Sequence, residues 1–194
     1  MVDELNDYIT NLLPGDEKEF LSSDSIDRPG ANDNEAFKHL TPEFLSCLKT
    51  SCLPNHSMKL KIGTTIMLIR NLDQFEGLCN GTRLTVSSTN IGNTIYIPRM
   101  SLSLSQYLWP FKLIRRQFPI IVSFAMTINK SQGQSLDHVG LYFPKGVSSH
   151  GQLYVAMSRV KSKASLKILI HDKDKIPLHQ TTNVVFKEVF HNVV

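Results

Sequence analysis

The sequence has few cysteines and no long apolar run. Its 194 residues hold three cysteines, Cys47, Cys52 and Cys79, which are too few for a disulfide framework and indicate reduced thiols. Even with His56 as a fourth ligand, their spacing fits neither common zinc pattern. The longest mainly apolar stretch, residues 118–126, is about half of the ~20 residues that a membrane span needs, and the N-terminus is acidic, unlike a signal peptide. We therefore expect a soluble, intracellular protein with no membrane partner.

Several catalytic motifs are missing from these residues. Gly146 and Gly151 have the glycine spacing of a phosphate-binding G-x4-G-K-[ST] loop, but Gln152 and Leu153 follow, so the lysine and the magnesium-binding hydroxyl are absent. No G-x-S-x-G, H-E-x-x-H or paired-carboxylate arrangement is present, which excludes the common hydrolytic triads and zinc proteases. Asp172, after an apolar run, is interpreted as a solvated strand end. We expect no metal site and no independent ATP hydrolysis.

Charge is divided unevenly along the chain. Residues 1–50 hold 11 acidic and 4 basic side chains, whereas residues 51–194 hold 6 acidic and 17 basic ones, a net charge of +11. Lysine and arginine gain free energy by displacing counterions from phosphates, so this second part favours a polyanionic partner. Charge alone leaves nucleic acid and an ordinary solvated surface equally open.

The N-terminal part reads as helix, strand, loop and helix. Apolar residues recur at three- and four-residue steps from Val2 to Leu13, which predicts a helix that ends at Pro14-Gly15. A short strand is predicted at residues 18–22, and the polar, acidic stretch 23–35 is interpreted as a long loop. A second helix is predicted from Thr41, with Thr41 as its cap and a proline at its first position.

The middle of the chain changes to a strand pattern. Five short runs rich in β-branched and apolar residues are separated by glycine turns, which predicts antiparallel strands that close into a small barrel. These runs are residues 58–62, 64–70, 82–87, 94–99 and 111–116.

After residue 118 the pattern alternates between strands and helices. Buried strands are predicted at residues 119–126, 138–143 and 166–170, with helical segments at 127–136 and 148–160 between them. This order is typical of a parallel sheet with crossover helices. The tail beyond His171 is expected to end in a helix from Asn183.

Two segments carry chemistry of their own. Residues 125–135 read A-M-T-I-N-K-S-Q-G-Q-S and place small polar groups, an ammonium and a glycine where a strand gives way to a turn. Such a turn offers N–H groups, hydroxyls and a cation to phosphate oxygens. Residues 152–160 read Q-L-Y-V-A-M-S-R-V and place Arg159 near a helix end. A lone arginine there is usually a surface or capping residue.

Together these segments resemble two signatures of the superfamily-one DNA helicases of the Pif (petite integration frequency) type, including plant and Helitron-transposon members. Residues 125–135 are similar to helicase motif V, and residues 152–160 are similar to motif VI. Residues 59–73 resemble the start of the family's Src-homology-three-like insert, and residues 77–83 resemble its first turn. The resemblance extends over about residues 3–170.

The resemblance implies an α/β fold: a RecA-like parallel-sheet half-motor with an inserted small antiparallel β-barrel. It divides the chain into 1–57 as the first part of the second motor domain, 58–118 as the barrel, 119–170 as the rest of that domain, and 171–194 as a tail. The family's first motor half, with its phosphate loop and magnesium-binding acids, has no counterpart in these residues.

The resemblance also implies roles for single residues. Arg159 is expected to act as an arginine finger on the γ-phosphate of ATP, with Gln132 and Gly133 near the nucleotide. ATP and Mg²⁺ would serve as cofactors only with a complementing first motor half, in the same or another chain, and single-stranded DNA would be the other partner. The residues expected to face the DNA are Thr127, Asn129, Lys130, Ser131, Arg70 and Asn71.

The implied function is that of the C-terminal half of an ATP-dependent 5′-to-3′ DNA helicase, acting in DNA unwinding, repair, recombination or telomere maintenance and inactive alone. The implied compartment is the nucleus, with the mitochondrion as the second candidate. Two alternatives stay open: a non-catalytic nucleic-acid-binding module, and a decayed transposon remnant. The module would stack bases on Tyr96, Tyr107, Trp109 and Phe111, although barrel-core positions are the favoured interpretation of these aromatics.

Overall fold

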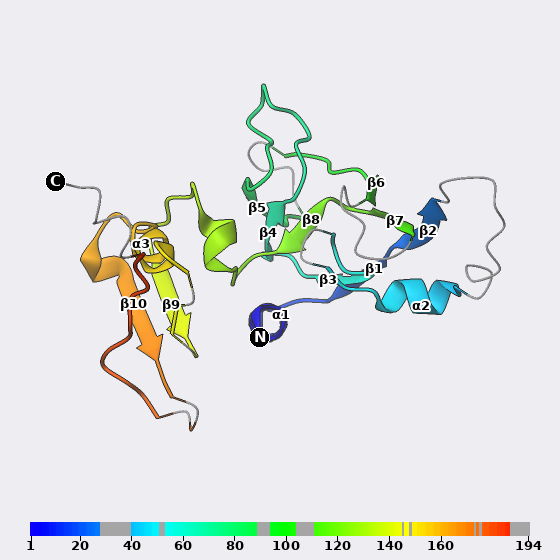
Figure 1. Cartoon of the computed structure of the whole chain (residues 1–194). Coiled ribbons are helices and arrows are strands. Elements are labelled where there is room, and N and C mark those ends of the chain that lie inside the picture. Colours follow the sequence, from blue (N-terminus) through cyan, green and yellow to red (C-terminus); the bar gives the residue numbers. More distant parts are fainter. Residues whose placement is uncertain are drawn as a thin grey trace. The chain divides into compact units, whose positions relative to one another are not determined.

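A computed structural model describes residues 1–27, 40–50, 53–88, 94–103, 111–144, 146–147, 149–172, 174 and 176–186 (Figure 1). They form two compact units, Met1–Ala125 and Met126–Val194. The first unit contains α1 (Val2–Leu12), β1 (Lys18–Leu21), β2 (Ser23–Asp27), α2 (Pro42–Cys47), β3 (Ser57–Leu60), β4 (Thr65–Leu68), β5 (Arg83–Thr85), β6 (Met100–Ser103), β7 (Lys112–Gln117) and β8 (Ile120–Val122). The second contains the 3₁₀ turns η2 (Ile128–Ser131) and η3 (Lys163–Ser165), the helix α3 (Gln152–Met157), and the strands β9 (Val139–Phe143) and β10 (Leu166–Ile170).

The first unit is built from antiparallel ladders. The strand orders are β1-β3, β2-β7-β6 and β5-β4-β8, and every pairing within them is antiparallel. Antiparallel pairing of the middle strands is therefore confirmed, but the described pairings do not close a barrel. One apolar core lies on β3, β4 and β8, around Leu68 and Ile120, and a second lies between α2 and β7, around Leu45 and Leu113.

One of the five predicted middle strands is absent from the described structure. Residues 94–99 carry no strand, although Ile95 and Ile97 pack against the first core and Tyr96 is exposed. Apolar side chains alternate in this segment because one of its sides packs against the core, although the segment forms no hydrogen-bonded strand ladder. Phe111 is buried in the second core, as expected for a core aromatic, whereas Tyr107 and Trp109 lie outside the described residues.

The N-terminal helices follow the sequence closely. The structure confirms α1 and the strand that begins at Lys18. Lys61 anchors the end of α1, because its Nζ donates to the carbonyl oxygens of Asn11 and Leu13 at 3.4 and 3.0 Å. At α2, Thr41 Oγ1 accepts the backbone N–H of Phe44 at 3.3 Å, so the predicted cap is confirmed.

The predicted loop over residues 23–35 is wrong for its first part. Residues 23–27 form β2, paired with β7, and residues 28–35 lie outside the described chain. The acidic side chains suggested a solvent-exposed loop. Asp24 instead faces inward, directly opposite Arg115 in the strand register, and Ile26 packs against the second core. A paired carboxylate can occupy a buried position that the hydrophobic pattern alone assigns to a loop.

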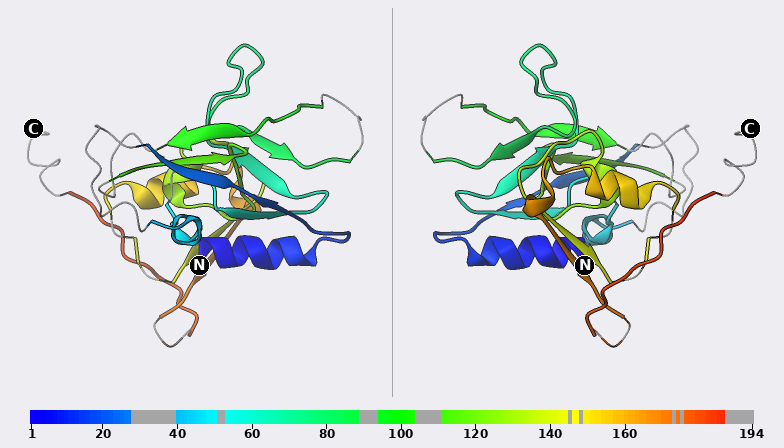
Figure 2. Two further views of the ribbon diagram at one scale, coloured as in Figure 1. Left: turned by 90° about the vertical axis from the view of Figure 1, so that its right-hand side faces the viewer. Right: turned by 90° about the vertical axis from the view of Figure 1, so that its left-hand side faces the viewer.

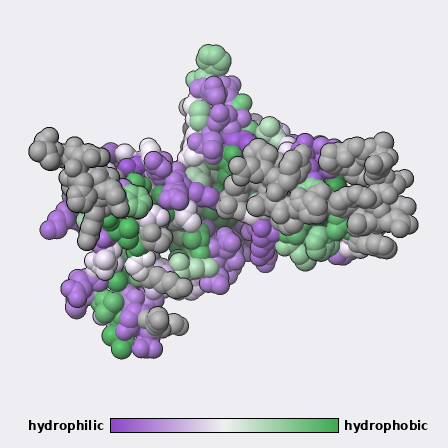
Figure 3. All heavy atoms as spheres, viewed as in Figure 1, coloured by the Kyte–Doolittle hydropathy of each residue, from purple (hydrophilic) through white to green (hydrophobic). Residues whose placement is uncertain are grey.

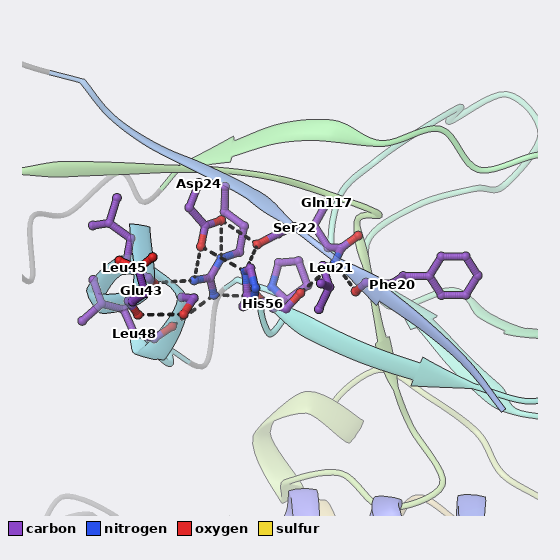
Figure 4. Close-up of polar contacts among 12 residues, drawn as sticks. Phe20, Leu21, Ser22, Asp24, Glu43, Leu45, Leu48, His56 and Gln117 are labelled. Atoms are coloured by element: carbon purple, nitrogen blue, oxygen red, sulfur yellow. Dashed lines mark hydrogen bonds and ion pairs between the residues drawn. The ribbon is translucent and has the colours of Figure 1, made fainter. Parts of the chain in front are cut away.

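Arg115 and Asp24 form a buried ion pair in this unit. Figure 4 shows Asp24 with its neighbours Ser22 and His56. Their side chains are 1% and 4% exposed, and Arg115 Nε and Nη2 donate to the two Asp24 oxygens at 3.0 and 2.8 Å. The remaining donors of Arg115 reach the backbone carbonyls of Leu45, Leu48 and Pro54 at 2.9–3.1 Å. The guanidinium thus joins two strands, the helix α2 and the segment that follows it.

Polar neighbours complete the network. Ser22 Oγ donates to Asp24 Oδ1 at 2.6 Å and lies 2.8 Å from His56 Nδ1. Gln117 Nε2 donates to the carbonyls of Phe20 and His56 at 2.9 and 3.1 Å. Burial raises the pKa of Asp24, but the hydrogen bonds from Arg115 and Ser22 and the charge of Arg115 outweigh it, so that this pKa lies below its ordinary value of 3.8.

The strand predicted within residues 119–126 exists but belongs to a different sheet. It was expected in the parallel sheet, and this is wrong: β8 pairs antiparallel with β4 through Ile66↔Val122 and Leu68↔Ile120. Its continuous apolar character comes from burial in an antiparallel core, a pattern that periodicity cannot distinguish from a buried parallel strand. The packing therefore divides the chain after Ala125, whereas the domain boundaries at residues 57 and 118 stay predictions.

The second unit contains the crossover that the sequence predicts. Strands β9 and β10 pair in parallel from Val139↔Leu166 to Phe143↔Ile170, and α3 connects them, packing Ala156 into a small core with Phe143. The helices are shorter than predicted: α3 has six residues, and the segment 127–136 forms only the 3₁₀ turn η2. The tail helix is wrong for residues 183–186, which carry no helix, and its remainder lies outside the described residues.

The surface of the described chain is mixed in polarity. The loop between β4 and β5 projects from its sheet in every view (Figure 2), and hydrophilic residues cover most of it (Figure 3). In the second unit, Ile168 and Leu169 of β10 and Tyr142 of β9 are exposed. Among the described residues, no helix is long and apolar enough to cross a membrane.

We predict that Asp24→Ala destabilises the chain strongly. Removal of the carboxylate leaves the guanidinium of Arg115 buried without its counter-charge, and such a change costs about 3–5 kcal/mol. Asp27→Ala is the matched control, because the ion pair of Asp27 with Lys112 is solvent-exposed and worth about 1 kcal/mol or less. Urea unfolding measures both, and equal losses in the two variants would contradict a dominant role for the buried pair.

The lowered pKa of Asp24 makes stability depend on acid pH. A carboxyl group with a folded-state pKa below its unfolded value contributes stability above the unfolded pKa and loses it as pH falls through the folded pKa. We expect the free energy of unfolding to fall from about pH 5 downwards, more steeply in the wild type than in Asp24→Asn. Urea titrations across this range test it; parallel slopes for the two proteins would rule out Asp24 as the titrating group.

Candidate nucleotide and nucleic-acid interface

Residues 125–135 form a compact turn after β8. The carbonyl of Thr127 accepts the N–H groups of both Lys130 and Ser131, at 3.0 and 3.2 Å, which winds the chain into η2. Gly133 has φ of +80°, a backbone conformation that side-chain-bearing residues rarely adopt, and it reverses the chain after the turn. Ile128 packs against the core of the second unit and fixes the inner side of the turn.

The turn separates the predicted DNA-facing residues into two groups. Thr127 and Asn129 are exposed, and Lys130 is half-buried. Ser131 is buried and its Oγ donates to the carbonyl of Ile128 at 2.7 Å, so this hydroxyl supports the turn from inside. Gln132 and Gly133, predicted near a nucleotide, are exposed.

Arg159 lies at the end of the second candidate segment. Gly151, with φ of +73°, precedes the first turn of α3, and Ala156 anchors that helix in the core. The helix ends at Met157, and the backbone then returns to the first segment: Leu136 N donates to the carbonyl of Arg159 at 2.8 Å, and Leu136 forms a parallel bridge with Val160. The two candidate segments are therefore neighbours through the backbone.

The guanidinium of Arg159 adds a side-chain connection between the same segments. Nη1 donates to the carbonyl of Gln134 at 3.1 Å and, more weakly, to that of Ser131 at 3.5 Å. Nε donates to the carbonyl of Val155 at 2.9 Å, and Nη2 donates to Ser158 Oγ at 2.8 Å. The structure thus brings the predicted phosphate contact, Arg159, together with the turn that carries the predicted DNA contacts.

Arg70 and Asn71 belong to the first unit, so they form a separate group. Arg70 Nη2 donates to the carbonyl of Ser103 at 3.0 Å, and Asn71 Oδ1 accepts the N–H of Asn80 at 2.7 Å. Both side chains are exposed and begin the loop between β4 and β5. They stabilise the base of that loop and leave guanidinium and amide surface open to solvent.

The residues of this chain fit one contact to a terminal phosphate rather than a whole nucleotide site. Arg159 supplies a planar cation, but the sequence has no phosphate loop beside it. Within the described ranges, no group of three His, Cys, Asp or Glu side chains is placed to hold a metal ion. Asp172 instead closes a turn, since its Oδ1 accepts the N–H groups of Asp174 and Ile176 at 2.9 Å.

The acceptors of Arg159 were not predictable from residue types. Sequence reasoning identified the arginine and the polar turn, but the partners are backbone carbonyls of Ser131, Gln134 and Val155, and a carbonyl is present at every residue. The sequence signal that could have indicated this contact is the resemblance of residues 125–135 and 152–160 to helicase motifs V and VI. The contact with the carbonyl of Val155 is the helix-capping role that a lone arginine at this position predicts, and the contacts with Ser131 and Gln134 add a connection to the turn.

We predict that Arg159→Ala loosens the turn even in the chain alone. Loss of the charged donors removes one hydrogen bond from each of the carbonyls of Gln134 and Val155 and should cost about 1–2 kcal/mol, with faster amide exchange over residues 130–136. Lys161→Ala is the control, because Lys161 is exposed and only 3.9 Å from an equally exposed Asp137. Hydrogen exchange with unchanged rates over the turn would contradict the contact.

Comparisons with known proteins identify the relatives of this chain. The family model of the DNA helicase Pif1 2B domain matches residues 43–88, and a helicase model matches residues 113–186. The chain is 32% identical to the ATP-dependent DNA helicase PIF1 of Xenopus laevis over 155 residues, which cover 74% of this chain and 24% of that protein. It is 33% identical to the human protein of the same name over 142 residues, 68% of this chain and 22% of that protein. The chain thus spans about a quarter of the length of these relatives.

Solved structures show the same fold. The crystal structure of Pif1 helicase from Candida albicans has a TM-score of 0.60 at 24% identity and covers 92% of this chain and 45% of its own. Bacteroides Pif1 bound to single-stranded DNA has a TM-score of 0.63 at 20% identity, covering 98% and 42%. Bacteroides Pif1 in complex with ADP-AlF3 and single-stranded DNA has a TM-score of 0.58 at 18% identity, covering 98% and 41%. The fold is RecA-like, and the chain belongs to the Pif1-type superfamily-one helicases, of which it represents a C-terminal part.

Proposed function

We propose that this chain is the C-terminal motor half of an ATP-dependent 5′-to-3′ DNA helicase and acts on single-stranded DNA. The observation that carries the proposal is the contact of Arg159 with the turn around Ser131 and Gln134. A side chain suited to a γ-phosphate and a turn suited to a DNA backbone are thereby parts of one hydrogen-bonded assembly. The relatives solved with single-stranded DNA and with a nucleotide support both assignments.

Hydrolysis in this proposal needs an ATP-binding half, in the same or another chain. ATP, held with Mg²⁺ by that half, supplies the free energy for movement on DNA. The guanidinium of Arg159 would meet the developing charge on the phosphate oxygens, and its planar fork suits such contacts better than an ammonium. Thr127, Asn129 and Lys130 offer a hydroxyl, an amide and a cation to the DNA backbone.

The finer architecture and the cellular role are also part of the proposal. We assign residues 58–118 to the family's Src-homology-three-like insert on the antiparallel strands β3, β4 and β5 and on the match to the 2B domain. Arg70 and Asn71, at the base of the loop in this insert, would contribute further DNA contacts. Repair, recombination or telomere maintenance in the nucleus, with the mitochondrion as second compartment, follows from the family resemblance.

A non-catalytic nucleic-acid-binding module is the second candidate function. In this structure the nitrogens of Arg159 donate to acceptors of the chain itself, and the sequence contains no phosphate loop. The chain therefore has no need of a nucleotide to order this turn. Binding of single-stranded DNA that is unaffected by any ATP-binding half would favour the module.

We predict weak, sequence-indifferent binding to single-stranded DNA that falls with salt. The logarithm of affinity should decrease with the logarithm of salt by about 0.7 for each phosphate neutralised, and Lys130→Ala should reduce this slope by about that amount. Lys59→Ala is the matched control, because Lys59 already pairs with Glu17 at 3.1 Å. Fluorescence anisotropy with oligothymidylate measures the slopes; binding that is absent at low salt or insensitive to salt would refute the proposal.

We predict that Arg159→Ala abolishes DNA-stimulated hydrolysis once the chain is joined to a Pif1-type ATP-binding half. Loss of an arginine finger lowers turnover by about 10³–10⁵, and ATP affinity should change little because other groups hold the nucleotide. Arg159→Lys should rescue little. Steady-state hydrolysis and nucleotide binding separate the two effects, and near-normal turnover in Arg159→Ala would remove the assignment.

A further inference from the structure

The most buried residues of helix α1 are polar. Asn6 and Thr10 are 5% and 4% exposed, one helical turn apart. Val2 and Ile9, on the same side of the helix, are only half-buried, and Leu5, Tyr8 and Leu12 are exposed. The apolar contact of this helix is therefore limited, and specific hydrogen bonds of its buried polar residues contribute to its docking.

Asn6 makes such bonds with Val122, at the end of β8, and with Ala125, the first residue of the motif V-like segment 125–135. Its Nδ2 donates to the carbonyls of Val122 and Ala125 at 3.2 and 3.0 Å, and its Oδ1 accepts the N–H of Ala125 at 2.7 Å. The side-chain amide therefore pairs with both backbone groups of Ala125, as a neighbouring strand would. These contacts join positions 116 and 119 residues apart in the chain.

Asn6 is itself held on a fixed base. Thr10 Oγ1 donates to the carbonyl of Asn6 at 2.8 Å, and Lys61 holds the C-terminal end of α1 through the carbonyls of Asn11 and Leu13. Lys61 lies directly after β3, and β4 follows, so α1 is tied to the strands of the first unit. Helix α1, which Lys61 holds beside β3 and β4, therefore keeps Ala125 at a fixed position relative to these strands through Asn6.

The anchored residue is the last of the first unit and stands two positions before Thr127. Between β8 and Thr127 the described hydrogen bonds also hold Ser123, through Thr65 and Arg83, but those at Ala125 come from Asn6. Thr127 in turn begins the turn that carries the proposed DNA contacts. The side-chain amide of Asn6 therefore fixes the backbone at Ala125, two residues before Thr127.

We propose that Asn6 is a positioning residue for DNA binding: it fixes the backbone at Ala125 and so sets where the motif V-like turn begins. The DNA-binding part of this inference rests on the proposed function. A purely structural role would stabilise the whole first unit equally, whereas a positioning role acts on the segment from Val122 to Ser131.

The test compares Asn6→Asp with a matched control in the 194-residue chain. Asn6→Asp keeps the size and the acceptor but replaces the donor that faces two carbonyls. Asn11→Asp, the control, adds the same charge at an exposed position of the same helix. Hydrogen exchange over residues 122–131 is compared with exchange in β4, and binding of a 15-residue oligothymidylate is measured at low salt.

We expect exchange over residues 122–131 to rise about tenfold or more in Asn6→Asp, with less than about threefold change in β4, and DNA affinity to fall about fivefold or more. The control Asn11→Asp should stay within about twofold of the wild type in both measurements. If Asn6→Asp does not fold, Asn6→Ala, which adds no charge, takes its place.

Three outcomes decide the matter. Exchange that rises equally in β4 and in residues 122–131 overturns the proposal in favour of general stabilisation. Localised loosening with unchanged DNA affinity overturns the positioning role in DNA binding. If the wild type itself binds no single-stranded DNA, the proposed function fails, and the exchange measurement alone then upholds or overturns the anchoring of Ala125.

Discussion

The buried pair of Arg115 and Asp24 is the constraint on which the first unit depends. A guanidinium that is 1% exposed must satisfy every donor inside the protein, and here its acceptors come from β2, from α2 and from the irregular segment before His56. Such a group tolerates one arrangement of its partners, because any displaced carbonyl or carboxylate leaves charge uncompensated. This polar network thus acts beside the apolar core of Leu45, Leu53 and Leu113 in holding segments that have little regular structure.

An arginine also links the two candidate segments of the second unit, residues 125–135 and 152–160. Most donors of Arg159 bind backbone carbonyls, but its side chain is only partly buried. Water or a phosphate can therefore replace one of these acceptors at a smaller cost in free energy than at Arg115. One arginine therefore acts as fixed scaffolding, whereas the other is suited to exchange partners. Exposure therefore separates the two arginines: Arg115 is fully buried, whereas Arg159 is partly open to solvent.

The sequence predicted elements whose signals are local. The periodicity of α1, the Thr41 cap and the parallel strands β9 and β10 could all be read from neighbouring residues. It failed where a distant partner decides the outcome: β2 depends on Arg115, 91 residues from Asp24, and β8 depends on β4. For the site, the motifs gave Arg159 and the polar turn, while the inward orientation of Ser131 and the role of Asn6 required coordinates.

The parallel pairing of β9 with β10 has a practical consequence for work on this chain. Within the described residues each of these strands has one strand partner, and on the second edge of β10 the carbonyl of Ile170 accepts the N–H of Leu178. The strands lack a second ladder there and carry exposed side chains such as Ile168 and Leu169. Open edges of this kind recruit further strands as protein concentration rises. An oligomer of this chain would carry more positive charge than a single chain. The ratio of protein to DNA measured in a titration would then not describe the single chain. Light scattering across the working concentrations should therefore precede the interpretation of any DNA titration.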